Sequence, residues 1–235
     1  MPTRKRPTLT AKQIAALRRF DSATVSNAIE SFDVRHPTAG YASLELRCMF
    51  PGLPPAVGYA LTCTVDTTTP RRGGGAGMGK LVRALRAAPK PAIVVLKAEG
   101  QEPLRNCHIG DVMGTLFHRM GAAAAVSDAG VRDLAGIAER APGLQVFAAG
   151  TVVSHGDFHI VEVGPTVSIC GLTISPGDLL HGDSSGLVSI PHTVAARLPT
   201  VAAKVLKAEA AIVDYIQSTE FDYRALAKRF GPNWA

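Results

Sequence analysis

The 235-residue sequence predicts a single domain of the mixed α/β class. Between residues 91 and 148, apolar runs typical of buried strands alternate with segments whose apolar residues have helical spacing. Beyond Gly150 the pattern changes to short strand-like segments separated by turn residues, which is typical of antiparallel or barrel-like β structure. No internal repeat or low-complexity linker divides the chain, so we expect one domain.

The chain opens with two predicted helices. Thr10 can cap a helix that runs to about Arg19, and Asp21 or Ser22 can cap a second helix that ends near Phe32. After a segment rich in proline and glycine, we expect a strand, a helix and a buried strand, at residues 59–65, 80–88 and 91–97.

The α/β pattern continues and then gives way to short strands. The next elements expected are a helix, a strand, a helix and a strand, at residues 111–120, 123–127, 132–141 and 144–148. The short strands expected after them are residues 151–154, 158–163, 166–170, 172–174 and 186–190. A final helix over residues 195–217 should break at Pro199, because proline lacks the amide hydrogen that a helix interior needs.

Composition and charge exclude several classes of protein. The hydrophobic content of 46% and charged content of 19% are those of a folded globule, not of a disordered or collagen-like chain. The formal net charge of +6 favours anionic partners without saying which kind. The basic cluster at residues 4–6 lies between Pro2 and Pro7, and we expect a solvated tail rather than a nucleic-acid contact.

Cysteine spacing and hydropathy indicate the compartment. The four cysteines are scattered, so neither a disulfide framework nor a zinc knuckle is indicated. No apolar run is long enough for a membrane span, and the first ten residues lack the apolar stretch of a signal peptide. These features predict a cytoplasmic protein with no membrane partner.

One glycine-rich segment resembles a phosphate-binding loop. Gly74, Gly79 and Lys80 have the spacing of that motif, but Leu81 stands where a magnesium-binding hydroxyl is required. We therefore interpret the segment as a loop that leads into a helix, although Arg71, Arg72 and Lys80 remain candidates for contact with an anionic substrate.

Two segments carry groups suited to an anionic ligand. The expected helix start at Gly110–Thr115 presents unpaired backbone amides, although every helix has such an end. In Ser127–Asp133, Arg132 could donate two hydrogen bonds to a carboxylate, and Asp133 could supply an oxygen to a divalent cation. Equally, Asp128 could simply cap the helix while Arg132 and Asp133 are surface charges.

Taken together, these segments match a known pattern. Twenty residues separate Asp111 from the Arg132-Asp133 pair, and this spacing resembles the signature of the class II pyruvate aldolases related to the regulator of ribonuclease activity A, the RraA-like family. The similarity covers about residues 15–215, with agreeing blocks at Leu17–Ala28, Gly58–Thr62, Gly110–Asp133 and Ile174–Pro191. The sequence departs from the family at residues 105–109 and at Asp128-Ala129-Gly130, which border the expected substrate pocket.

The resemblance implies a fold and an activity. The fold would be an α-β-β-α sandwich with a swivelling β/β/α-like core, assembled as a homotrimer or hexamer. Members of the family cleave 4-hydroxy-4-methyl-2-oxoglutarate or related 4-hydroxy-2-oxo acids to pyruvate and a second oxo acid, and many also decarboxylate oxaloacetate. Residues 11–217 would form the catalytic domain, between a flexible tail at 1–10 and an extension at 218–235.

The resemblance also implies roles for particular residues. Asp133 would bind Mg²⁺, Mn²⁺ or another divalent cation directly, and Asp111 would act through a water on that cation. Arg132 would pair with the substrate carboxylate or enolate oxygen, and Gly110, Asp111, Val112 and Met113 would form the substrate cradle, with the amides of Val112 and Met113 holding the carboxylate.

The resemblance does not identify the general base or the exact substrate. Three groups are candidates for the base that takes the proton from the C4 hydroxyl. They are a water activated by Asp111, the side chain of His108 and the side chain of Glu102. A regulator that binds a ribonuclease without catalysis, and a lyase or decarboxylase for a different oxo acid or sugar acid, are the alternative functions. The presence of both Asp111 and Asp133 favours catalysis.

Overall fold

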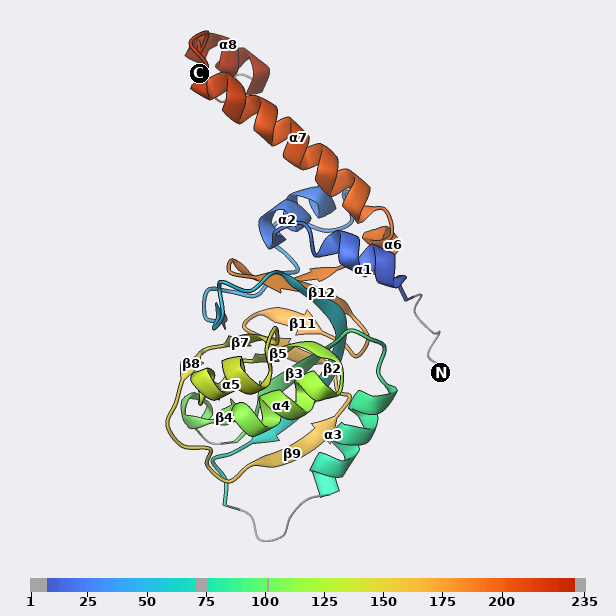
Figure 1. Ribbon diagram of the computed structural model, residues 1–235, viewed down its shortest axis with the longest axis vertical. Coiled ribbons are helices and arrows are strands. Elements are labelled where there is room, and N and C mark those ends of the chain that lie inside the picture. The colour runs from blue at the N-terminus through green and yellow to red at the C-terminus, as the bar shows by residue number, and fades with distance from the viewer. Residues whose placement is uncertain (1–7, 71–75, 101, 231–235) are drawn as a thin grey trace.

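The computed structural model describes residues 8–70, 76–100 and 102–230. Its main element is an eight-stranded mixed sheet, with helices packed against it (Figure 1). The predicted single-domain α/β fold is confirmed. The basic cluster at residues 4–6 and the residues Arg71, Arg72 and Gly74 lie outside the described part of the chain.

Four parallel strands form the centre of the sheet, in the order β7-β5-β3-β2. They are β2 (Ala56–Asp66), β3 (Ala92–Ala98), β5 (Ala122–Ser127) and β7 (Gln145–Ala148). All four were expected, β2 from its alternating pattern and the other three from their apolar residues, since strands of a parallel sheet are buried on both faces. Their carboxyl ends therefore share one edge of the sheet.

Antiparallel strands complete the sheet, most of them beyond Gly150, where the sequence predicts short strands. They are β1 (Arg47–Cys48), β9 (His159–Val163), β12 (Leu179–Asp183) and β13 (Gly186–Ile190). β12 was not expected, because the sequence LLHGD lacks both alternation and β-branched residues. It is nevertheless buried along its whole length, between β2 and β13.

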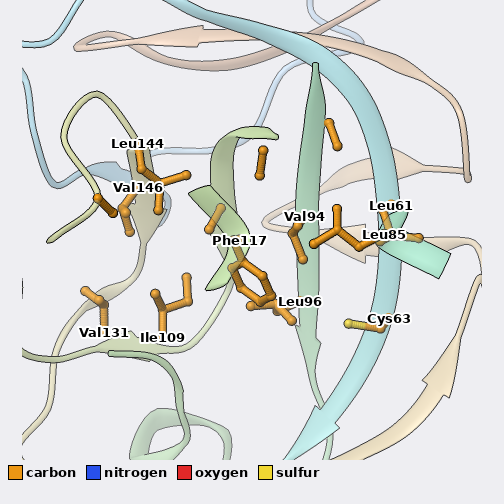
Figure 2. Close-up of a cluster of buried hydrophobic side chains, with 14 of the residues drawn as sticks. Leu61, Cys63, Leu85, Val94, Leu96, Ile109, Phe117, Val131, Leu144 and Val146 are labelled. Atoms are coloured by element: carbon orange, nitrogen blue, oxygen red, sulfur yellow. The ribbon is translucent and has the colours of Figure 1, made fainter. Parts of the chain in front are cut away.

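Three helices cover the face of the sheet nearest the candidate site (Figure 1). They are α3 (Ala76–Ala87), α4 (Asp111–Arg119) and α5 (Leu134–Arg140). Figure 2 shows the ring of Phe117 on α4 beside Leu96 of β3, with Ile109 and Val131 on its other side. Phe117 is completely buried, so it joins the helix layer to the sheet.

Two further apolar clusters complete the core. The hairpin of β10 (Val167–Ile169) and β11 (Leu172–Ile174) contributes to one of them, together with Ile93 and Phe147. The other lies under α1 (Ala11–Leu17), α2 (Ser22–Glu30), α6 (His192–Ala195) and the start of α7 (Leu198–Gln217). The predicted caps are confirmed: Thr10 accepts from the Gln13 amide and Asp21 from the Thr24 amide.

The C-terminal helices extend away from the sheet as an arm (Figure 1). Only Leu198 and Ala202 of α7 are buried, and α8 (Tyr223–Phe230) follows at its far end. The helix was expected to break at Pro199, but the break lies a few residues earlier. The interruption between α6 and α7 precedes Pro199, which lies in the first turn of α7, where a missing amide hydrogen costs little.

Three short parallel strands form a second, smaller sheet. They are β4 (Cys107–Ile109), β6 (Gly130–Val131) and β8 (Gly150–Thr151), in that order, and β4 follows a short 3₁₀ helix, η1 (Pro103–Arg105). Strands of two or three residues leave little periodic pattern to detect, which is why β4 and β6 were not expected. This small sheet positions the candidate site.

No helix in the described part of the chain is long and apolar enough to span a membrane.

The burial of Phe117 generates a prediction about stability. Replacing Phe117 with Ala should lower the free energy of unfolding by about 3–5 kcal/mol, because the ring leaves a cavity between α4 and the sheet. Urea denaturation measures this change. The control is Leu44→Ala, since Leu44 is 95% exposed and should leave the midpoint unchanged. Equal midpoints for both variants would contradict the role given to Phe117.

Candidate functional site

The start of α4 forms one side of the site. Gly110 is the N-cap, with extended backbone angles and no side chain to bond the first amides of the helix. The amide of Val112 donates instead to Asp111 Oδ1, at 2.8 Å. The amide of Met113 has no partner among the described residues. Of the two amides expected to hold a substrate carboxylate, the Val112 amide is therefore already bonded to Asp111.

Arg132 and Asp133 form the other side. The amide of Arg132 donates to the carbonyl of Ile109 at 2.9 Å, which places the pair next to the start of α4. Arg132 Nε lies 3.1 Å from Asp133 Oδ2. A Cβ on Gly110 would lie 3.4 Å from the same carboxylate oxygen and 3.5 Å from Arg132 Nε. The two segments that the sequence singled out are thus in contact.

Asp133 has a strained backbone. Its φ of 55° is in the left-handed region, although it is not a glycine, and its side chain does not cap α5. Non-glycine residues in this region cost free energy and are often found at functional sites. The helix expected from Arg132 begins only at Leu134 because Asp133 adopts this conformation.

Arg140 is a site residue that sequence reasoning missed. Its Nη1 lies 2.8 Å from Asp111 Oδ2, so the Asp111 carboxylate is held by an arginine as well as by the Val112 amide. Gly136 makes this approach possible, since a Cβ there would lie 2.9 Å from the Asp111 Cβ. The spacing of Gly136 and Arg140 by four residues on one predicted helix was the available signal.

A cavity of about 170 Å³ lies where these segments meet. The predicted residues that line it are Gly110, Asp111, Val112, Met113 and Arg132. Cys107, His108, Ile109, His155 and Phe158 complete the lining. Asp133 is not among the lining residues, and it reaches the site through its contacts with Arg132 and Gly110. Sequence reasoning did not select His155 or Phe158, because both lie in a segment with no recognisable motif.

Two residues considered as general bases are not placed for that role. His108 is 1% exposed, its Nδ1 lies 2.8 Å from Ser127 Oγ, and burial lowers its pKa to about 4. Glu102 accepts from Arg105 at 3.0 Å on the surface and does not line the cavity. Neither is a suitable acceptor for a substrate proton.

Other sequence hypotheses are also resolved. Asp128 does not cap α5, because its carboxylate accepts from the Ala98 amide at 2.7 Å and pairs with Lys97. The helix expected from Lys80 begins earlier, at Ala76, so Gly79 lies within α3 rather than in a loop. Lys80 lies in the helix as expected, and it does not line the cavity.

The donor groups fit a hydrated divalent cation. Among the described residues, no group of three or more His, Cys, Asp or Glu side chains could form a complete protein cage. Mg²⁺ does not need one, because it is typically bound through one or two carboxylates and keeps several waters. Asp133, 42% exposed at its side chain, and the neighbouring Asp111 match that requirement.

Fold and site together define an α/β protein in which the start of a helix lies beside an Arg-Asp pair. Residues 22–189 match the model of the RraA-like family, described as Aldolase/RraA, and the chain belongs to this family. The family includes both aldolases and ribonuclease inhibitors. A comparison with curated proteins finds no significant match.

Solved structures confirm the fold. An uncharacterized protein from Pseudomonas syringae pv. tomato superposes with a TM-score of 0.70 at 22% identity, covering 93% of this chain and 94% of that one. Streptomyces coelicolor RraAS2, an unusual member of the RNase ES inhibitor RraA family, gives 0.65 at 23%, with 87% and 96% covered. A structure described as a novel cellulase from gut-associated microbes gives 0.72 at 18%, with 90% and 91% covered.

The buried His108 generates a prediction about pH. Its lowered pKa means that the unfolded chain binds a proton more readily than the folded chain, so its contribution to stability is complete above about pH 6.5 and falls as the pH drops towards 4. Between about pH 7.5 and about pH 5 this contribution should decrease by about 2 kcal/mol.

Urea denaturation at these two pH values measures the change. His108→Asn should lose about 2 kcal/mol less than the unsubstituted protein over this interval. The control is His36→Asn, because His36 is exposed and should leave the pH dependence unchanged. The same pH dependence in all three proteins would show that His108 is not the group responsible.

Proposed function

We propose that this protein is a divalent-metal-dependent class II aldolase. It cleaves 4-hydroxy-4-methyl-2-oxoglutarate, or a related 4-hydroxy-2-oxo acid, to pyruvate and a second oxo acid, and it decarboxylates oxaloacetate as a side reaction. The observation that carries the proposal is the contact of Gly110, at the start of α4, with Arg132 and Asp133 beside one small cavity. Both reactions pass through the enolate of pyruvate, and this arrangement suits an anionic 2-oxo acid.

Each residue has a chemical role in this proposal. The Met113 amide and the guanidinium of Arg132 bind the pyruvyl carboxylate, since a helix start and an arginine both favour anions. The Val112 amide joins them when Asp111 Oδ1 releases it. Asp133 would bind Mg²⁺ or Mn²⁺ directly and Asp111 would act through a water on the cation, which when bound would supply a Lewis acid for the charge that develops on the C2 oxygen.

Arg140 and Phe158 support these groups. Arg140 orients the Asp111 carboxylate through the 2.8 Å contact of its Nη1. Phe158 contributes an apolar wall to the cavity, and a wall of this kind excludes water and strengthens the pairing of Arg132 with a bound carboxylate.

The ribonuclease regulator is less well supported by the site than the aldolase. A regulator needs a docking surface, whereas the cavity between α4 and the Arg132-Asp133 pair is suited to a small molecule. A lyase or decarboxylase for a different oxo acid or sugar acid would use the same cavity, and the substrate that releases pyruvate distinguishes it from the aldolase.

The aldolase proposal predicts a requirement for metal and for Asp133. The purified protein should release pyruvate from both 4-hydroxy-4-methyl-2-oxoglutarate and oxaloacetate with Mg²⁺, and EDTA should abolish the release, as measured by a coupled pyruvate assay. Asp133→Asn should reduce kcat by about 100-fold or more, since oxyanion stabilisation is worth this much.

The matched control is Asp214→Asn, because Asp214 is an exposed carboxylate on α7, remote from the cavity. It should retain full activity. Full activity of Asp133→Asn would overturn the assignment of the cation ligand.

We also propose that the protein is cytoplasmic and self-associates as a homotrimer or hexamer. The arm formed by α7 and α8 supports self-association, because Val213, Ile216 and Tyr223 are 49%, 45% and 62% exposed on it. Two helices of this length gain little stability on their own, so an apolar surface in contact with a second copy would stabilise them.

This proposal predicts a change of mass on disruption of the arm surface. Val213→Lys combined with Ile216→Lys should shift the protein to a smaller species, because the new charges would be buried in the interface. Sedimentation velocity measures the change, with Leu104→Lys, at an 88% exposed residue outside the arm, as the control. An unchanged mass for the double variant would place any interface elsewhere.

A further inference from the structure

The proposed aldol cleavage needs a proton acceptor that the proposed decarboxylation does not need. When the C3–C4 bond of a 4-hydroxy-2-oxo acid breaks, the C4 hydroxyl must lose its proton as the C4 carbonyl forms. Oxaloacetate has no such hydroxyl, and its C4 carboxylate leaves as carbon dioxide. A general base at the site would therefore affect one reaction and not the other.

Most titratable groups on the cavity wall are already engaged. Asp111 accepts from the Val112 amide at Oδ1 and from Arg140 at Oδ2. His108 is bonded to Ser127 through Nδ1 only, and its Nε2 is buried without a partner, but burial lowers the pKa of the ring to about 4, so Nε2 is a poor proton acceptor. Burial also raises the pKa of the Cys107 thiol, which disfavours the thiolate. Among the lining residues of the described chain, His155 is the remaining group that can accept a proton.

The hydrogen bond of His155 determines which ring nitrogen is available. Its Nδ1 lies 2.6 Å from the carbonyl oxygen of Gly156. A carbonyl oxygen can only accept, so Nδ1 carries the hydrogen and the neutral ring has its lone pair on Nε2. Nε2 has no partner among the described residues, and the ring lines the same cavity as Arg132.

The backbone beside His155 is anchored to the main sheet. Gly156 has a φ of 57°, and a Cβ there would overlap the carbonyl oxygen of Thr67, which follows β2. The same oxygen accepts from the Asp157 amide at 2.8 Å. Thr67 is itself bonded to Asn106, just before β4, through its amide at 2.8 Å. This chain of contacts ties His155 to the strand that leads into the cradle.

We propose that Nε2 of His155 is the general base of the aldol cleavage, an inference that rests on the proposed function. Nε2 takes the proton of the C4 hydroxyl, and the oxygen electron pair forms the C4 carbonyl. The electron pair of the C3–C4 bond becomes the double bond of the pyruvate enolate, and the second oxo acid leaves. Nε2 then loses its proton to solvent, and C3 takes a proton from solvent, so no net proton is consumed.

The ratio of the two activities tests this assignment. In His155→Asn, the side-chain amide can still donate near the position of Nδ1, but no group replaces Nε2. The kcat for cleavage of 4-hydroxy-4-methyl-2-oxoglutarate should fall by about 100-fold or more, the usual contribution of a general base. The kcat for oxaloacetate decarboxylation, measured with Mg²⁺ in the same preparation, should stay within about threefold, since that reaction does not use the base.

The matched control is His192→Asn. Its Nε2 makes the same type of bond, to the carbonyl of Gly177 at 3.1 Å, but His192 does not line the cavity, so both activities should be retained. Equal losses of both activities in His155→Asn, or no loss of cleavage, would overturn the assignment of His155 alone. Absence of pyruvate release from both substrates by the unsubstituted protein would overturn the proposed function instead.

Discussion

The candidate site depends on the pairing of β4 with β6. These strands contribute five residues in total, yet they bring Gly110 next to Arg132 and Asp133 from positions about twenty residues away. The Arg132 amide bond to the Ile109 carbonyl fixes the register at the point where both chains leave the sheet. Gly130 makes the packing possible, because a Cβ there would overlap Val152 next to β8. If this pairing were lost, the cradle and the Arg-Asp pair would separate.

The small sheet is in turn held at the carboxyl edge of the parallel strands. Asn106, completely buried, accepts from the amide and hydroxyl of Thr67 after β2, and its own carbonyl accepts from the Gly130 amide. Ser127, at the end of β5, bonds His108 in the middle of β4. Open parallel sheets bind ligands at this edge because side chains from several strand ends converge there. Here the strand ends of the main sheet support the small sheet, and the small sheet carries the residues proposed to bind the ligand.

The sequence predicted those parts of the structure whose signal is local. The parallel strands, the caps at Thr10 and Asp21 and the start of α4 at Asp111 follow from apolar runs and from capping chemistry. The contact of Asp111 with Arg140 and the presence of His155 on the cavity wall could not be predicted in this way. Both depend on which segments meet in space: Arg140 lies in a predicted helix, but nothing in the sequence paired it with Asp111, and His155 belongs to no run with recognisable periodicity. The resemblance to a family supplied the Asp111 and Arg132-Asp133 pattern, but it could not supply residues outside that pattern.

Burial explains why His108 supports the site whereas His155 is available to react. His108 lies closer in sequence to the cradle than His155 does, and it was the more obvious histidine. Its ring is enclosed between β4 and β5, where the charged form is disfavoured, so it serves best as a neutral link between the two sheets. His155 follows β8 and lines the cavity, with one nitrogen fixed by Gly156 and the other available. The same side-chain type therefore has a structural role on one wall of the cavity and a chemical role on the other, and the difference is set by access to the ligand rather than by position along the chain.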